Sequence, residues 1–180
     1  MLKNTITALM FVVLTMHSAP SLAQYVPYKA SGQNAVYYPT PTGGPSTYDG
    51  IGVGTHVGRH YFLGTIDTIG VFDPAPGVLY QGTFSGEQDI IAANDDVIKC
   101  RVSGNVQLDY LLSDGVVVGA VGLWNPKFVI IPGSTGRFAG ATGTFEGTAI
   151  NPPFNPQSPA WPFNWELSGQ INLGKAKGPK

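Results

Sequence analysis

Two histidines are the first residues whose spacing could support chemistry. His56 and His60 are four residues apart, which on a helix would place both side chains on one face, as in a metal site. Gly54 and Gly58 flank His56 and disfavour a helix. On a strand, residues four apart are separated by about 13 Å, too far for one ion. We therefore predict no metal site. Two roles stay open for each histidine: a structural hydrogen bond or an acid–base function.

Other reactive side chains lack the setting that their chemistry needs. Ser134 is not in a Gly-x-Ser-x-Gly elbow, and the glycines from 52 to 58 precede no helix that could bind a dinucleotide phosphate. A two-carboxylate hydrolase needs an inward acidic pair about 5–10 Å apart. The acidic residues instead fall on the polar side of alternating segments: Glu87, Asp89, Asp109, Glu146 and Glu166. We predict that these carboxylates face solvent and that the protein uses no cofactor.

The segments that must position any site alternate apolar and polar residues with a period of two. This pattern is clear at 78–90, 98–103, 106–112 and 163–173, and it is typical of strands with one buried and one wet face. We also expect an interrupted strand at 24–39, a loop at 40–50, a long glycine-broken strand at 51–72 and a stiff proline-rich loop at 151–162. No segment shows a helical period, so the sequence predicts a single all-β, antiparallel domain.

The stretch from Pro132 to Gly147 is predicted to be a tight corner between two strands. Glycines at 133, 136, 140 and 143 permit positive φ or close backbone approach. Arg137 is expected to tie the corner to nearby carbonyls or to a carboxylate. On the strand that leaves the corner, Phe145 should point inward and Glu146 outward.

Composition and the chain ends predict where the protein is located and which partners it can bind. Lys3, an apolar run at 6–14 and Ser21-Leu22-Ala23 predict a signal peptide over residues 1–23, so the protein is expected to be secreted or periplasmic. A retained N-terminal membrane anchor is the alternative. Residues 24–174 form the predicted domain, and 175–180 are a basic tail. The net charge of −1 and the absence of clustered basic residues argue against nucleic-acid binding, and no later segment is long and apolar enough to span a membrane.

Two segments are apolar at both parities, Val116–Val121 and Phe128–Ile131. Their outer face must therefore be covered as well, either by a loop or by another subunit. We favour a homo-oligomer in which Val117, Val121 or Val129 meets a neighbouring copy.

Three motifs resemble a known superfamily. The corner GSTGRFAGATGTFEG, the early segment Thr55-His-Val-Gly-Arg59 and the turn Ala92-Ala-Asn-Asp-Asp96 resemble, in order and spacing, those of allene oxide cyclase barrel-like proteins, a secreted bacterial branch of the allene oxide cyclase and dirigent superfamily. The resemblance covers roughly residues 25–174 and implies an eight-stranded calycin-like barrel. Ser134 and Asp95 stand where the family usually has glycine, and 151–162 looks like an insertion. The glycine corner is architectural and transfers no catalytic residue.

The remaining candidate site is the barrel lumen. Its predicted lining consists of Tyr80, Phe84, Gln88, Cys100, Tyr110, Phe145 and Trp165. Cys100 is the only cysteine, so an intrachain disulfide is impossible, and its alternation places it in the core. The same lining would suit an apolar pocket or a packed core. Three functions follow: a non-enzymatic module that binds a small apolar ligand or a partner, which we favour; a cyclase or isomerase that works on a hydrophobic substrate in the lumen; or a structural, envelope-associated oligomer.

Overall fold

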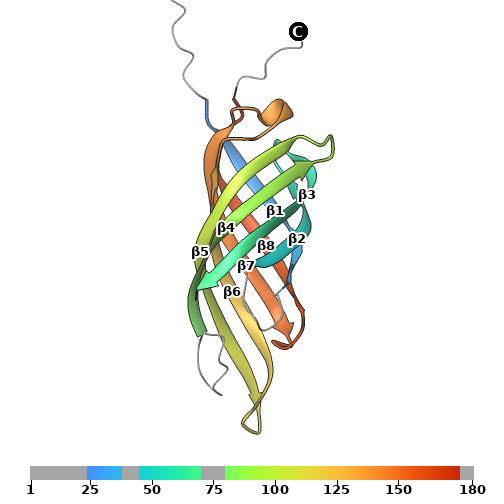
Figure 1. Cartoon of the computed structure of the whole chain (residues 1–180), viewed down its shortest axis with the longest axis vertical. Coiled ribbons are helices and arrows are strands. Elements are labelled where there is room, and N and C mark those ends of the chain that lie inside the picture. Colours follow the sequence, from blue (N-terminus) through green and yellow to red (C-terminus); the bar gives the residue numbers. More distant parts are fainter. Residues whose placement is uncertain (1–23, 38–44, 70–79, 175–180) are drawn as a thin grey trace, which may run out of the picture.

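The structure is a computed structural model that describes residues 24–37, 45–69 and 80–174. Eight strands form one closed antiparallel barrel in which each strand pairs with the next and β8 pairs with β1 (Figure 1). The predicted all-β, eight-stranded antiparallel barrel is thereby confirmed. The strands are β1 (Val26–Tyr37), β2 (Ser46–Gly54), β3 (Gly58–Ile69), β4 (Tyr80–Ala92), β5 (Val97–Ser113), β6 (Val116–Ile130), β7 (Thr142–Phe154) and β8 (Ala160–Asn172). The predicted signal peptide, 1–23, and the predicted basic tail, 175–180, lie outside the described residues.

Alternation places apolar side chains in the lumen and acidic ones outside. Phe84, Gln88 and Ile90 are buried on β4, while Glu87 between them is exposed. On β7, Phe145 is buried and Glu146 is exposed, as predicted. The predicted outward orientation of the carboxylates is also confirmed. Glu87, Asp109, Glu146 and Glu166 are exposed, and half-buried Asp89 forms a salt bridge of 3.1 Å with Lys99.

Inward-facing glycines make room for the aromatic rings of neighbouring strands. Gly50, Gly64 and Gly104 are the direct cross-strand partners of Phe62, Tyr48 and Phe84. A Cβ atom on any of these three glycines would lie 2.6–2.7 Å from the partner's ring. Each ring therefore lies over the backbone of the adjacent strand, which lets a narrow barrel hold large side chains.

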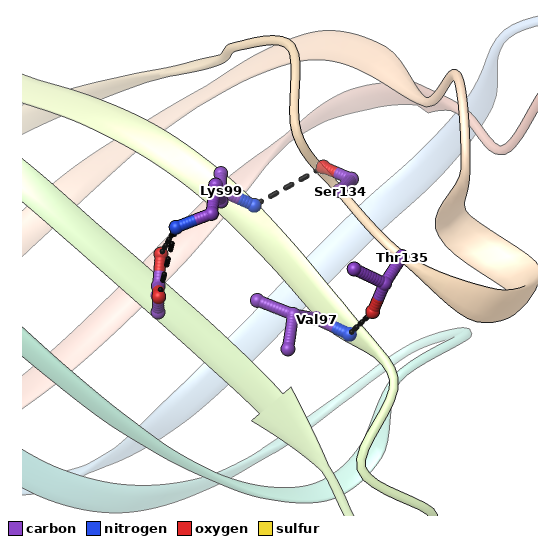
Figure 2. A network of polar contacts seen from close by, with 5 residues as sticks. Val97, Lys99, Ser134 and Thr135 are labelled. Atoms are coloured by element: carbon purple, nitrogen blue, oxygen red, sulfur yellow. Dashed lines mark hydrogen bonds and ion pairs between the residues drawn. The ribbon is translucent and has the colours of Figure 1, made fainter.

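The corner between β6 and β7 continues the barrel wall where β6 ends. Ser134 and Thr135 reach from the corner to the start of β5, where their hydroxyl oxygens accept hydrogen bonds from the backbone N–H groups of Lys99 and Val97 (Figure 2). The N–H of Thr135 donates in turn to the carbonyl of Val97. These bonds pair edge amides of β5 that lie beyond its last pair with β6, at Cys100 and Ile130.

The predicted geometry of the corner is confirmed. Glycines 133, 136, 140 and 143 all have φ between 54° and 142°. Arg137 donates to the carbonyl of Val57 at 3.1 Å and forms an ion pair with Asp96 at 3.5 Å. Phe138, in the 3₁₀ turn Gly136–Phe138, is completely buried in the hydrophobic core, and the guanidinium of Arg137 lies over its ring, 4.7 Å from the centroid.

Several element boundaries differ from the sequence prediction. The segment 51–72, expected as one strand, is interrupted by a turn at 55–57 that separates β2 from β3, and β2 already begins at Ser46 within the expected loop. His56 takes φ of 65° in this turn, and its Nε2 lies 3.1 Å from the carbonyl oxygen of Pro27, so the turn is fastened to β1. Conversely, the alternating segments at 98–103 and 106–112 form one strand, β5, which runs unbroken through Gly104, where the ring of Phe84 covers the backbone.

The proline-rich segment 151–162 was predicted as a loop, which is correct only for residues 155–159. Residues 151–154 extend β7 and residues 160–162 begin β8. The ladder between β6 and β7 shifts register here, between Ala120 and Gly122, so Pro152 and Pro153 fall where regular pairing is interrupted. Phe154 and Trp161 are buried against each other, with ring centroids 4.6 Å apart, at the end of the barrel opposite the corner.

Candidate functional site

A cavity of about 80 Å³ lies in the lumen. Six Phe and Trp rings form much of its wall: Phe62, Phe84, Trp124, Phe128, Phe163 and Trp165. These rings contact one another: Trp124 lies 5.1 Å from Phe84 and 5.3 Å from Phe163, measured between centroids. The interior is thus largely packed, and the cavity has about half the volume of a 150 Å³ cavity known to admit benzene.

A small set of polar groups shares this wall. Tyr48 donates its hydroxyl to Oε1 of Gln88 at 2.9 Å. Three other buried polar atoms have no hydrogen-bond partner: Oη of Tyr28, Oδ1 of Asn34 and Nε1 of Trp165. All three residues line the cavity. Because buried polar groups are nearly always paired with protein or with water, three unpaired atoms around one cavity are available to bond a small polar molecule there.

His60 is the ionisable side chain of the cavity whose protonation could change near neutral pH. It is 7% exposed, and its Nδ1 lies 3.0 Å from the carbonyl oxygen of Gly58. A carbonyl can only accept, so Nδ1 carries the proton and Nε2 is left with its lone pair. Burial lowers the pKa of His60, although the hydrogen bond to Gly58 opposes the shift. The side chain is therefore neutral at pH 7.

The predicted lining residues divide into two groups. Phe84, Gln88 and Trp165 do line the cavity. Phe145 is buried outside it and stacks on Phe128 with centroids 4.9 Å apart. Tyr110 is half-buried on β5 and is not part of the cavity wall. The side chain of Tyr80 lies outside the described residues.

Cys100 is fully buried in the core, as the alternation predicted, but it does not line the cavity. Burial raises the pKa of its thiol, and the nearby carboxylate of Asp89 adds to this effect. The thiol is therefore protonated at neutral pH and unsuited to nucleophilic chemistry.

Sequence reasoning missed the part of the site that β1 and β2 supply. Tyr28, Asn34 and Tyr48 come from segments that glycines and prolines interrupt, so their periodicity gave no clear inward parity. One signal was available: Tyr28, Ala30, Gly32 and Asn34 alternate along the chain. That alternation identifies the inward face only when the partners of these residues on β8 are known.

The described residues contain no group of three or more His, Cys, Asp or Glu side chains arranged to hold a metal ion. Within residues 24–37, 45–69 and 80–174, we also find no helix with the length and apolar character needed to cross a membrane. Comparison with protein families, curated proteins and solved structures returned no match to this chain.

Proposed function

We propose that the protein is a non-enzymatic binding module that holds a small uncharged ligand in the barrel lumen. The observation that carries this proposal is the cavity itself: aromatic walls surround three buried polar atoms that have no partner. None of the described residues that line the cavity is an Asp, Glu, Lys or Arg. A charged ligand would lose its hydration there without gaining a counter-ion, so a neutral ligand is favoured.

The cavity volume limits both the size and the affinity of that ligand. About 80 Å³ suits a molecule smaller than benzene. With a ceiling of about 1.5 kcal/mol per heavy atom, four heavy atoms give at most ~6 kcal/mol, a dissociation constant on the order of tens of micromolar. Larger ligands would require the aromatic wall to move.

Xenon and isobutane, both small and apolar, are suitable probes for the test. The ¹²⁹Xe chemical shift and ligand-observed NMR should show saturable binding to the intact protein. Ala149 is an inward residue of the cavity wall, and Ala149→Leu adds an isopropyl group there, so this variant should abolish binding. The matched control is Thr148→Leu, which changes the adjacent exposed residue. Unsaturable signals with these probes and also with acetone and 2-propanol, or equal binding by both variants, would overturn the proposal.

A cyclase or isomerase is the second candidate, and His60 is the observation that favours it. A neutral imidazole with a free Nε2 lone pair on a cavity wall has the protonation state of a general base. The resemblance to allene oxide cyclase barrel-like proteins supports the same candidate. In D₂O, His60 would remove an α-proton from acetone and return a solvent-derived deuteron. Faster α-deuteration with the native protein than with His60→Phe would support this function, and equal rates would exclude it for this probe.

We further propose that the protein is exported and acts as a homo-oligomer. Export rests on the sequence pattern at residues 1–23, and mass spectrometry of the mature protein should find Gln24 as its first residue.

For the oligomer, the outer face of β6 and β7 supplies Leu123, Val129 and Ile150, which are 39–47% exposed. Phe128 and Ile130, which the apolar run also contains, point into the core. Exposed Lys127 and Glu146 are direct cross-strand partners beside this row. We expect them to form reciprocal ion pairs with a second copy.

A further inference from the structure

The unpaired polar atoms of the lumen indicate which hydrogen-bonding groups the ligand should have. Tyr28 is 1% exposed and Trp165 is 8% exposed, and both have a donor without a partner. Each residue belongs to the cavity wall, Tyr28 on β1 and Trp165 on β8. The wall therefore offers two hydrogen-bond donors, a phenolic O–H and an indole N–H, and neither is bonded to an acceptor of the protein.

An acceptor lies close to these donors, over two inward glycines of β2. A Cβ atom on Gly52 would be 2.9 Å from Nε2 of His60 and 2.7 Å from the ring carbons Cη2 and Cζ2 of Trp165, and the ring centroids of His60 and Trp165 are 6.1 Å apart. A Cβ atom on Gly54 would be 3.2 Å from Oη of Tyr28. Gly52 and Gly54 are two residues apart on one face of β2, so the three polar side chains gather above one short, side-chain-free stretch of backbone.

The protonation pattern decides which ligand group fits this cluster. Nδ1 of His60 donates to Gly58, so Nε2 requires a donor from the ligand. Tyr28 and Trp165 require an acceptor. A hydroxyl group both donates and accepts, whereas a carbonyl only accepts and a hydrocarbon does neither. A hydroxyl therefore matches the cluster best.

We propose that the lumen binds a small neutral alcohol whose hydroxyl donates to Nε2 of His60 and accepts from Tyr28 or Trp165. The aromatic wall would hold the carbon atoms of the ligand, and the absence of charge on the wall would exclude its carboxylate analogue. This inference rests on the proposed lumen-binding function and specifies the ligand class for that same site.

A series of three molecules of matched shape tests the inference: 2-propanol, acetone and isobutane. Binding of each to the intact protein is measured by ligand-observed NMR titration. We expect 2-propanol to bind about 10-fold more tightly than isobutane, since one well-placed hydrogen bond contributes about that factor, and acetone to lie between them. Acetate, which is charged, should not bind.

Variants of His60 separate the hydrogen bond from simple packing. His60→Phe keeps an aromatic ring but removes the acceptor, so 2-propanol should lose its advantage while isobutane still binds. His60→Gln restores an acceptor and should recover part of the advantage. Tyr61→Phe, at the adjacent exposed residue on the outer face of β3, is the matched control and should change nothing. The comparison of the three ligands on the native protein stands even if a variant fails to fold.

The possible results distinguish this inference from the proposed function. Equal binding of all three neutral molecules, or tightest binding of isobutane, would overturn the alcohol assignment and leave lumen binding intact. Failure of every probe would overturn both. An ordered water molecule that no probe displaces would likewise overturn both, because the polar cluster would then be satisfied by solvent alone.

Discussion

At the scale of single residues, the lumen is defined by polar groups that burial keeps uncharged. His60 is the clearest case, because its pKa lies below the ordinary value and its protonated form has no carboxylate on the cavity wall to stabilise it. Tyr28 and Tyr48 behave in the same way: burial raises the pKa of both phenols, so neither ionises at physiological pH. The site can therefore donate and accept hydrogen bonds without carrying charge.

This account of His60 predicts a pH-dependent stability. The folded-state pKa of His60 is lower than its unfolded value, so below about pH 6.5 the unfolded chain binds the proton more readily than the folded one. The free energy of unfolding should therefore fall as the pH decreases below about 6.5, and it should be insensitive to this group above that value. The measurement is chemical denaturation between pH 5 and 8.

Two variants isolate the contribution of His60. His60→Phe should flatten the pH dependence below 6.5, whereas Tyr61→Phe, at the adjacent exposed residue, should leave it unchanged. The same slope in the native protein and in His60→Phe would show that His60 does not titrate in this range.

At the scale of elements, the barrel is shaped by pairs of inward glycines and aromatic rings, and by one corner, between β6 and β7, that is hydrogen-bonded to the start of β5.

Much of this architecture could be predicted from the sequence. The period of two at β4 and β8 gave the strands and their inward faces, and the glycines from 133 to 143 gave the corner. What the sequence could not give was register. Trp165 is the direct partner of Gly32, 133 residues away in the chain, and no local pattern encodes such a pair.

The same limit explains the boundaries that were wrong. A glycine in an alternating pattern suggests the end of a strand when only the sequence is considered. Gly104 nevertheless lies within β5, where the ring of Phe84 covers it. Proline also breaks a regular ladder, but Pro152 and Pro153 fall at a register shift. The polar half of the lumen was missed for a related reason, because Tyr28 and Tyr48 become inward residues only through pairing with β8 and β3.

The corner provides a prediction at this scale. Ser134→Ala combined with Thr135→Val removes the two hydroxyl acceptors of the Val97 and Lys99 amides. Two lost hydrogen bonds should lower the free energy of unfolding by roughly 1–3 kcal/mol. Amide hydrogen exchange at Val97 and Lys99 should accelerate, while exchange in the centre of β5 should not.

Thr142→Val is the matched control, since Thr142 is an exposed residue at the start of β7. Unchanged exchange at Val97 and Lys99 in the double variant would mean that the corner does not protect the edge of β5.

At the scale of the whole molecule, the outer surface carries two rows of exposed apolar side chains. One row, on β6 and β7, contains Val129 and is the proposed interface between copies. A second row on β2 and β3, unrecognised from the sequence, contains Ile51, Val53, Tyr61 and Leu63 at 47–67% exposure. Long, apolar exposed faces of this kind mark interaction surfaces more often than free ones.

Static light scattering of the mature protein should therefore give a mass above that of one chain. Val129→Lys should lower the mass to that of a monomer while the far-ultraviolet circular dichroism spectrum stays unchanged. Ile51→Lys, a matched charge on the other row, should keep the native mass. A monomeric native protein would rule out the oligomer, and dissociation by Ile51→Lys alone would place the interface on β2 and β3.

The β5–β6 hairpin also belongs to this scale, because it extends beyond the rest of the barrel (Figure 1). Its tip is the two-residue turn Asp114–Gly115, with φ of 51° and 77°, as a type I′ turn requires. Leu111, Leu112, Val116 and Val118 are 39–63% exposed on its two strands. The lumen, however, is where cavity, burial and unpaired polar atoms coincide, so the central claim is best tested there.

The most direct test is the indole N–H signal of Trp165 in a ¹H–¹⁵N correlation spectrum during titration with 2-propanol. Nε1 of Trp165 has no partner, whereas that of Trp124 donates to Asn151 at 2.9 Å and that of Trp161 to Ser158 at 3.1 Å. Assignment follows from the signal that Trp165→Phe removes. Our account predicts a saturable downfield shift of the Trp165 proton, with the Trp161 proton unchanged. Trp165 lines the cavity, so a bound ligand should change its signal even if the ligand hydroxyl accepts from Tyr28. A Trp165 signal that stays in place up to the highest concentration of 2-propanol would therefore contradict ligand binding in the lumen.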